Sequence, residues 1–194
     1  MAGLREQKIL KAKLHIQACA LELFARQGYS DTTVEQIAEA SEVSPSTFFR
    51  YFQTKESVVL YDSLDPIIVE AFRAQPNGIS IIRALRTAMS EVFSSLPADK
   101  QRLERQRGTL IRTVPELQPY IYQELARSID LFAEIIAERT GRDANDLEVR
   151  NIAGATIGVS MAALLQAYQN PGETNLIVAF DNALALLEKG LLTA

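Results

Sequence analysis

The chain has 194 residues, a formal net charge of −4 at pH 7 and 47% hydrophobic side chains. This composition indicates a globular protein with a core, and it excludes a chain that coats nucleic acid through its overall charge. The single cysteine excludes an internal disulfide framework, and the N-terminus lacks the pattern of an export leader, so we expect a cytoplasmic protein.

Charge is distributed unevenly along the chain. Residues 1–30 carry five basic side chains against two acidic ones, whereas residues 60–194 carry 13 basic and 17 acidic ones. The N-terminal part is therefore the part expected to meet a polyanion, with an ordinary solvated surface as the alternative.

The first two predicted elements are helices, because apolar residues recur at helical spacing and no strand-like alternation of useful length is visible. The first spans about residues 8–27 and ends at Gly28, which suits a left-handed cap. Thr33 and Gln36 form a capping-box pattern that begins a second helix, which ends near residue 40.

A third helix follows after a short turn. Ser44 is its predicted N-cap, Pro45 its first residue, and it ends near residue 52. Two short helices at this spacing, with the small side chain of Ala38 at their crossing, are typical of a helix-turn-helix motif.

Six further helices are predicted after the motif. Thr54 caps the first of them, which covers residues 55–74 with a kink at Pro66. The others are expected at about 79–96, 99–113, 116–140, 146–169 and 174–192. Residues 151–172 carry no charge, but Ala, Gly and polar side chains dilute them, so we expect a buried helix and no membrane span. The predicted fold class is all-α, with a three-helix helix-turn-helix head and a helical body.

Residues 20–59, ALELFARQGYSDTTVEQIAEASEVSPSTFFRYFQTKESVV, resemble the DNA-binding head of the TetR family of bacterial transcriptional regulators. The matching positions are Leu23, Phe24, Gly28, Tyr29, Thr33, Ile37, Ala38, Val43, Ser44, Thr47, Arg50, Tyr51, Phe52 and Lys55. The resemblance implies a DNA-binding domain at residues 1–55 and a ligand-binding and dimerisation domain at 56–194. It also implies a dimer whose third helices read a palindromic operator on double-stranded DNA, most often as a repressor that a small-molecule effector releases.

The predicted DNA contacts lie mainly on the third helix. They are Thr33, Ser44, Pro45, Ser46, Thr47, Phe49, Arg50, Tyr51 and Lys55. Arg50 suits either a bidentate guanine contact or a phosphate clamp. Thr33 and Lys55 are phosphate anchors by resemblance, and Lys11 and Lys13 are further candidates. In the aromatic run, Phe48 and Phe52 lie four residues apart and are expected in the core.

Two residues depart from the family pattern. Glu42 stands where the turn usually has glycine, so a non-glycine residue has to adopt a left-handed conformation at a cost of about 1–2 kcal/mol. Phe49 stands where the family usually has tyrosine, so one hydroxyl-to-phosphate bond is lost. Both departures bear on affinity for DNA.

The last two predicted helices are apolar on more than one face. In residues 174–192 one stripe contains Phe180 and Leu184 and another contains Ala183 and Leu186. The second stripe predicts a homodimer through helices at about 146–169 and 174–192, with a wholly internal helix pair as the alternative.

The resemblance places an effector cavity among the helices of residues 79–169. The candidate ligand contacts are Met89, Phe93, Arg107, Arg112, Tyr120, Phe132 and Met161. The two arginines suit an anionic group, and ordinary core or surface roles are the alternative for each residue. The connector from Leu60 to Pro66 is also similar to a branch of the family with acyl-CoA-like ligands, and the effector is expected to be small and mainly apolar.

Two other classes of function remain open from the sequence. One is an enzyme, although His15 and Cys19 lack metal-ligand spacing and no phosphate loop or nucleophile elbow occurs, so no metal or cofactor is expected. The other is an interaction protein that keeps the head without binding an operator.

Overall fold

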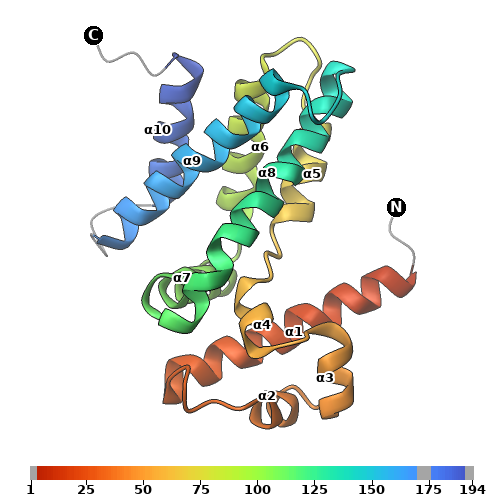
Figure 1. The fold of residues 1–194 in the computed structure, drawn as a ribbon, viewed down its shortest axis with the longest axis vertical. Coiled ribbons are helices and arrows are strands. Elements are labelled where there is room, and N and C mark those ends of the chain that lie inside the picture. Colours follow the sequence, from red (N-terminus) through yellow and green to blue (C-terminus); the bar gives the residue numbers. More distant parts are fainter. Residues whose placement is uncertain (1–3, 170–175, 191–194) are drawn as a thin grey trace. The chain divides into compact units, whose positions relative to one another are not determined.

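The computed structural model describes residues 4–169 and 176–190, and within these ranges it contains helices and no strand (Figure 1). The elements are α1 (Leu4–Gln27), α2 (Val34–Ala40), α3 (Pro45–Tyr51), α4 (Lys55–Leu60), α5 (Asp65–Arg73), α6 (Ile81–Ser95), α7 (Ala98–Thr113), the short 3₁₀ helix η1 (Pro115–Leu117), α8 (Gln118–Thr140), α9 (Leu147–Gln169) and α10 (Leu176–Glu188). The all-α prediction is confirmed.

The chain forms two compact units. Unit 1 comprises residues up to 63 together with residues 97–121, and unit 2 comprises residues 64–96 and those from 122 onward. The N-terminal helices thus share a unit with α7 and η1, which follow them in sequence by some 40 residues. The functional division at residue 55 stays a prediction.

The core of unit 1 lies between α1 and the helices that pack on it. Side chains from α1 to α4 and from η1 form one buried cluster: Ile16, Ala20, Leu21, Leu23, Phe24, Tyr29, Ile37, Ala38, Phe48, Phe52, Val58, Val59, Leu60, Val114 and Leu117. Leu103, Leu110 and Ile111 of α7 pack against it. The helix-turn-helix is therefore stabilised by residues far from it in the chain.

Local signals set the bounds of α2 and α3. The Thr33 hydroxyl accepts a hydrogen bond from the Gln36 N–H, and the Gln36 side chain accepts one from the Thr33 N–H, which confirms the capping box. Ser44 caps α3, and Pro45 occupies its first turn, as predicted. Gly28 ends α1 with a φ of 91°, a conformation that glycine adopts without strain.

The prediction of one kinked helix over residues 55–74 was wrong. The structure has two helices, α4 and α5, separated by residues 61–64, and Tyr61 is already extended with a ψ of 114°. Pro66 lies in the first turn of α5, where its missing N–H leaves no hydrogen bond unmade. The proline thus begins a new helix instead of bending an existing one.

Unit 2 is built from α5, α6, α8, α9 and α10. Its buried side chains include Phe72, Leu85, Phe132, Ile136 and Leu184. Helix α10 packs on α9 and α6, and the Phe93 and Phe180 rings stack with their centroids 4.9 Å apart. Within the described residues no helix has the length and apolar character needed to span a membrane.

Candidate nucleic-acid interface

Helix α3 has one buried and one exposed face. Phe48 is fully buried and Phe52 nearly so, which confirms their predicted place in the core. Phe49 is 50% exposed, and its ring meets the edge of Phe48 at a centroid distance of 5.5 Å. The side chains on the exposed face do not pack in the core. The helix can therefore contact another molecule through this face without losing its core contacts.

Three hydroxyl groups cluster at the start of α3. The Ser44 Oγ lies 2.9 Å from the Ser46 Oγ and donates to the Thr47 Oγ1 at 3.0 Å, while the Thr47 N–H donates to the Ser44 Oγ at 3.1 Å. These groups, with exposed Pro45, are the predicted contacts at this end of the helix. Their mutual hydrogen bonds hold the hydroxyl groups in place before any DNA is met.

The turn between α2 and α3 contains the expected left-handed residue. Glu42 has a φ of 54°, the only positive value among the non-glycine residues described. Its N–H donates to the Glu39 carbonyl at 3.0 Å, and the Val43 N–H donates to the Ala38 carbonyl at 2.9 Å. The prediction for Glu42 is confirmed, and the turn carries strain of about 1–2 kcal/mol.

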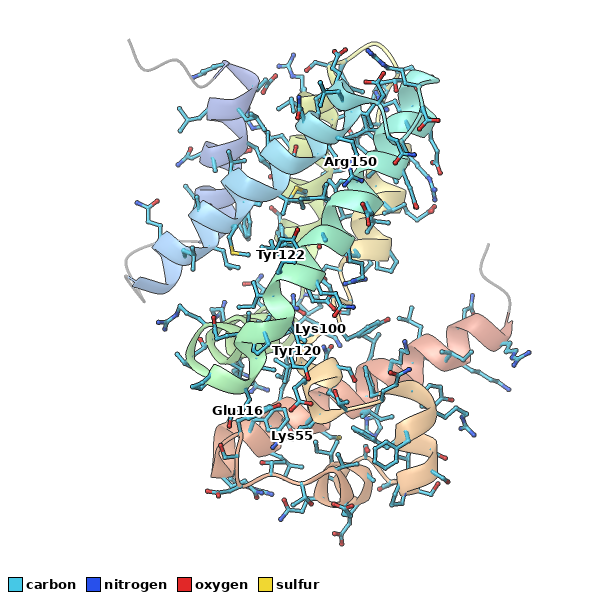
Figure 2. The ribbon with its side chains drawn as sticks, in the orientation of Figure 1. Lys55, Lys100, Glu116, Tyr120, Tyr122 and Arg150 are labelled. Atoms are coloured by element: carbon cyan, nitrogen blue, oxygen red, sulfur yellow. The ribbon has the colours of Figure 1, made fainter. Side chains whose placement is uncertain are left out.

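The Lys55 ammonium group contacts other residues of its own chain (Lys55 is labelled in Figure 2). It donates to the Tyr29 and Thr32 carbonyl oxygens at 2.8 and 3.0 Å and lies 4.1 Å from the centre of the Tyr29 ring. The Tyr29 hydroxyl in turn donates to Glu56 at 2.8 Å. Burial and this hydrogen bond raise the pKa of Tyr29. Lys55 thus ties the start of α4 to the loop before α2, and its role as a phosphate anchor stays a prediction.

A basic groove lies between the first turns of α1 and the end of α3. Its volume is about 760 Å³, and it is lined by Arg5, Lys8, Ile9, Lys13, Arg50 and Tyr51. The Lys13 ammonium group lies 4.7 Å from the centre of the Tyr61 ring, and the Arg50 guanidinium lies 5.0 Å from that of Tyr51. Arg5 and Lys8 were not among the DNA contacts predicted from the sequence. Lys11 was a predicted contact but does not line the groove.

Comparison with known proteins connects this geometry to a function. The family model described as "Bacterial regulatory proteins, tetR family" matches residues 16–61, and the one described as "MftR C-terminal domain" matches residues 79–192. The chain belongs to the TetR family. Members of this family are transcriptional regulators with a DNA-binding helix-turn-helix, and the enzyme alternative is rejected on that ground.

Two relatives in the TetR family are similar over most of this chain. The regulator TcmR of Streptomyces glaucescens is 37% identical over 153 residues, which are 74% of this chain and 67% of TcmR. The putative mycofactocin biosynthesis regulator MftR of Mycobacterium tuberculosis is 29% identical over 77% of this chain and 76% of its own. Both are named as transcriptional regulators.

Solved structures of TetR-family proteins share the fold. FadR of Thermus thermophilus, a repressor in complex with lauroyl-CoA, has a TM-score of 0.58 and 24% identity, covering 94% of this chain and 96% of its own. A putative TetR-family regulator of Syntrophomonas wolfei has a TM-score of 0.63 and 18% identity, covering 95% and 98%. At these identities the likeness shows the fold alone.

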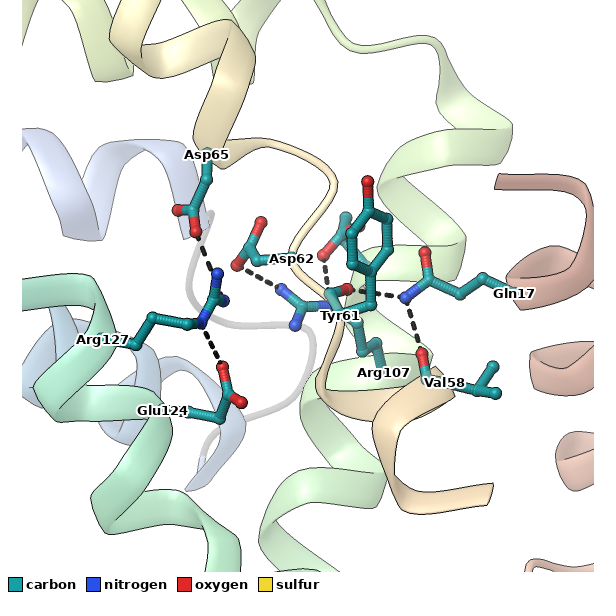
Figure 3. A network of polar contacts seen from close by, with 9 residues as sticks. Gln17, Val58, Tyr61, Asp62, Asp65, Arg107, Glu124 and Arg127 are labelled. Atoms are coloured by element: carbon teal, nitrogen blue, oxygen red, sulfur yellow. Dashed lines mark hydrogen bonds and ion pairs between the residues drawn. The ribbon is translucent and has the colours of Figure 1, made fainter. Parts of the chain in front are cut away.

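A network within unit 1 supports the DNA-binding helices of this TetR-family protein (Figure 3). The Gln17 amide donates to the Val58 and Tyr61 carbonyl oxygens at 2.9 and 2.7 Å. The Arg107 guanidinium donates to Asp62 and Glu104 at 2.8 Å each. Burial opposes the charge of Arg107, but the two carboxylates outweigh it and raise its pKa. The segment that follows α4 is therefore joined to α7.

The predicted effector contacts do not gather in one unit. Met89 and Phe132 are buried in the core of unit 2, and Phe93 packs against that core. Met161 is half-buried on α9 of the same unit. The remaining three lie in unit 1, where Arg112 and Tyr120 are exposed and Arg107 is held by carboxylates: Arg107, Arg112 and Tyr120. A ligand role for any of them stays a prediction.

Helices α9 and α10 leave an apolar surface uncovered. Val178 is 53% exposed and Leu186 50%, and Leu165 of α9 is also exposed. A groove of about 390 Å³ runs between the two helices and is lined by Val159, Ala162, Ala163, Gln166, Val178, Ala179, Asn182, Ala183 and Leu186. Ala179, Ala183 and Leu186 of the second predicted stripe line this groove, together with Val178, which the prediction did not include. Two further members of the predicted stripes lie outside what the structure describes, the side chain of Leu176 in the second stripe and the whole of Leu191 in the first. The dimer stays a prediction.

In the described part of the chain, no group of three or more His, Cys, Asp or Glu side chains is placed to hold a metal ion. The Cys19 thiol donates to the Ala40 carbonyl, with 3.5 Å between sulfur and oxygen, and burial raises its pKa. This cysteine therefore joins α1 to the end of α2 as a weak hydrogen-bond donor.

Proposed function

We propose that this TetR-family protein is a ligand-responsive repressor that binds a palindromic operator as a dimer and is released by a small, mainly apolar effector. The observation that carries most of the proposal is the two-sided character of α3. Its inner face is held in the core by Phe48, while Ser46, Thr47 and Arg50 are presented outward. A short helix presented in this way fits a major groove about 12 Å wide.

The uncovered face of α9 and α10 supports the proposed dimer. Exposed apolar side chains at Leu165, Val178 and Leu186 border a groove of small residues that allows close approach of another helix. A second copy offers the same surface in return, so the contact is two-fold and closes on itself. Such a dimer carries two α3 helices, and dimeric helix-turn-helix proteins bind half-sites about 34–36 Å apart.

The effector is proposed to bind in unit 2, because Met89, Phe93 and Phe132 give its interior an apolar, aromatic character. An effector that binds better to the arrangement with the α3 helices off the half-site spacing weakens DNA binding by its differential affinity. Helix α4 and the segment up to Pro66 form the proposed lever, and an acyl-CoA-like molecule is one candidate effector. Mass spectrometry of the purified protein under native conditions identifies a bound effector directly.

A mobility-shift experiment tests the DNA-binding proposal. The purified protein is expected to shift a palindromic fragment from beside its own gene, and Arg50→Ala is expected to remove the shift at the concentration that half-saturates the wild type. Arg26→Ala is the matched control, since Arg26 is exposed on α1 and does not line the basic groove. A wild-type protein that shifts no genomic fragment contradicts the proposal.

The dimer has its own test. The double variant Val178→Asp and Leu186→Asp puts charges on the uncovered face and is expected to give a monomer in light scattering, because a buried unpaired carboxylate is costly. Tyr122→Asp is the control, since Tyr122 is an exposed apolar side chain of unit 2 on α8. If the double variant keeps the mass of the wild-type dimer, this face is not the interface.

An interaction protein without an operator is the second candidate, and the two departures from the family pattern favour it. Glu42 adds strain and a negative charge to the turn before α3, and Phe49 lacks a hydroxyl group. A regulator whose Glu42→Gly and Phe49→Tyr variants bind DNA more tightly than the wild type supports the operator proposal. If neither the wild type nor these variants bind duplex DNA, the second candidate replaces the first.

A further inference from the structure

The basic groove of unit 1 combines a row of cations on α1 with the end of the recognition helix. Arg5, Lys8 and Lys13 lie along the first turns of α1, and Arg50 comes from α3. The lining contains no acidic residue. The groove is therefore positively charged, although the whole chain carries a net charge of −4.

Two of the groove's four basic groups, Lys13 and Arg50, lie over aromatic rings. Lys13 lies over the rings of Phe52 and Tyr61, and Arg50 over that of Tyr51. Among the side chains that the structure describes, none of the four basic groups pairs with a carboxylate. A cation on a ring keeps its charge uncompensated, so it remains able to bind an anion.

The arrangement fits a row of anions better than a single one. Residues 5 to 13 span about 12 Å of helix at 1.5 Å per residue. Arg5 and Lys8, three residues apart, share one side of α1, and Lys13 lines the same groove further along the helix. A duplex carries one phosphate per strand for about every 3.4 Å of its axis. A line of cations beside a helix that enters the major groove thus matches the sugar–phosphate backbone at the edge of that groove.

We propose that Arg5, Lys8 and Lys13 bind backbone phosphates of the duplex whose major groove α3 enters, so that the DNA-contacting surface extends along α1 beyond the helix-turn-helix. Arg50 lines the same groove from α3 and keeps both of its predicted roles, a phosphate clamp or a base contact. The inference rests on the proposed DNA binding by α3. These contacts add affinity on every sequence and carry no base preference.

The test measures duplex affinity as a function of salt for the full-length protein. The double variant Arg5→Ala and Lys8→Ala is compared with Lys11→Ala, which removes an exposed cation from the same helix outside the groove. Each phosphate contact contributes a slope of about 0.9 to the dependence of log affinity on log salt. Because a dimer of the double variant lacks four such contacts, the wild type should lose roughly 150-fold more affinity than the double variant between 50 and 200 mM salt, and Lys11→Ala should lie close to the wild type.

Two duplexes separate this inference from the proposed function. One is a fragment selected by the wild-type protein, and the other is an unrelated duplex of the same length. The proposal predicts the same flattening of the salt slope on both. If the wild type binds its fragment and the double variant keeps the wild-type slope, the groove proposal is overturned and the operator proposal stands.

The remaining outcomes are equally decisive. If no fragment is preferred but the salt slope on unrelated duplex still depends on Arg5 and Lys8, the operator proposal fails and the groove remains a phosphate site. If Lys11→Ala flattens the slope as much as the double variant, the basic N-terminal half of α1 acts through general charge and the groove is not a site. No binding to either duplex at 50 mM salt overturns both proposals.

Discussion

The two units of the molecule use their basic side chains in opposite ways. In unit 2 the arginines are paired with carboxylates in the described part of the chain: Arg73, Arg83, Arg86, Arg127, Arg142 and Arg150. Arg139 donates to the Gln75 and Pro76 carbonyl oxygens. In the basic groove of unit 1, Lys13 and Arg50 lie over aromatic rings instead, and no carboxylate pairs with Arg5 or Lys8 among the described side chains. The same residue types thus bind carboxylates in unit 2 and stay available to an anion in the groove of unit 1.

The groups that surround an arginine therefore indicate whether it stabilises the fold or is available to DNA, which the residue type alone does not. An arginine saturated by carboxylates contributes through the groups it holds, so its removal leaves buried or half-buried charges unpaired. An arginine on a ring leaves nothing unpaired when it is removed. Loss of stability should therefore follow the first kind of site, and loss of DNA affinity the second.

The largest effect is expected at Arg107, which binds carboxylates within unit 1, as Arg102 does at the surface. Its side chain is only 13% exposed, and Arg107→Met removes the cation that both Asp62 and Glu104 bind. The free energy of unfolding should fall by about 3 kcal/mol, measured by urea unfolding followed by circular dichroism. Arg105→Met, on an exposed position of the same helix, should change it by less than about 0.5 kcal/mol. Equal stabilities for the two variants contradict the assignment.

The next effect concerns Arg50. Arg50→Ala should lower operator affinity by about 1–3 kcal/mol, roughly 5- to 150-fold, because a phosphate or base contact is lost. Its free energy of unfolding should stay within about 0.5 kcal/mol of the wild type, since no carboxylate is left unpaired. If Arg50→Ala lowers the free energy of unfolding as well as the affinity for DNA, Arg50 stabilises the fold as the carboxylate-paired arginines do.

Arg86 and Arg83 of unit 2 both pair with carboxylates near the protein surface, but with different geometry, so they allow a comparison of two such ion pairs. Arg86 binds Asp181 through two hydrogen bonds of 2.7 and 2.8 Å, whereas Arg83 is 64% exposed and lies 3.6 Å from Glu188. Arg86→Met should cost about 1 kcal/mol of stability and Arg83→Met a few tenths at most. Neither change should alter the affinity of the dimer for DNA in a fluorescence titration.

The smallest effect is a pH dependence at Asp181. The hydrogen bonds from Arg86 hold the pKa of Asp181 below its ordinary value of 3.8. Because the folded pKa is the lower one, the stabilisation is complete above the ordinary value and is lost as pH falls through the folded one. Urea midpoints at pH 5, 4 and 3 should therefore drop less for Asp181→Asn than for the wild type. Parallel curves for the two proteins refute the coupling.

The sequence predicted local structure well and long-range pairing poorly. The caps at Thr33 and Ser44 and the strained turn at Glu42 depend on residues within a few positions of one another, so their signals are complete in a short window. The break before α5 was missed because a proline inside an apolar periodic run indicates either a kink or a new start.

The spacing of apolar residues along the sequence does not predict which charged side chains pair with one another. Asp62 and Arg107 are 45 residues apart, and nothing in either neighbourhood indicates that they meet. For the same reason Arg107 was predicted as a ligand contact and Arg5 was passed over. The basic groove requires the start of α1 to lie beside the end of α3, which only the folded core of unit 1 brings about.

Selection of binding sites from a random duplex library tests the central claim most directly, because the operator sequence does not have to be known to carry it out. With the wild-type protein we predict enrichment of a two-fold symmetric motif whose half-sites are about one helical turn, 34–36 Å, apart or a multiple of it. The same selection with Arg50→Ala should give no motif or a much weaker one. A wild-type selection that converges on no symmetric motif contradicts the claim that the exposed face of α3 reads an operator.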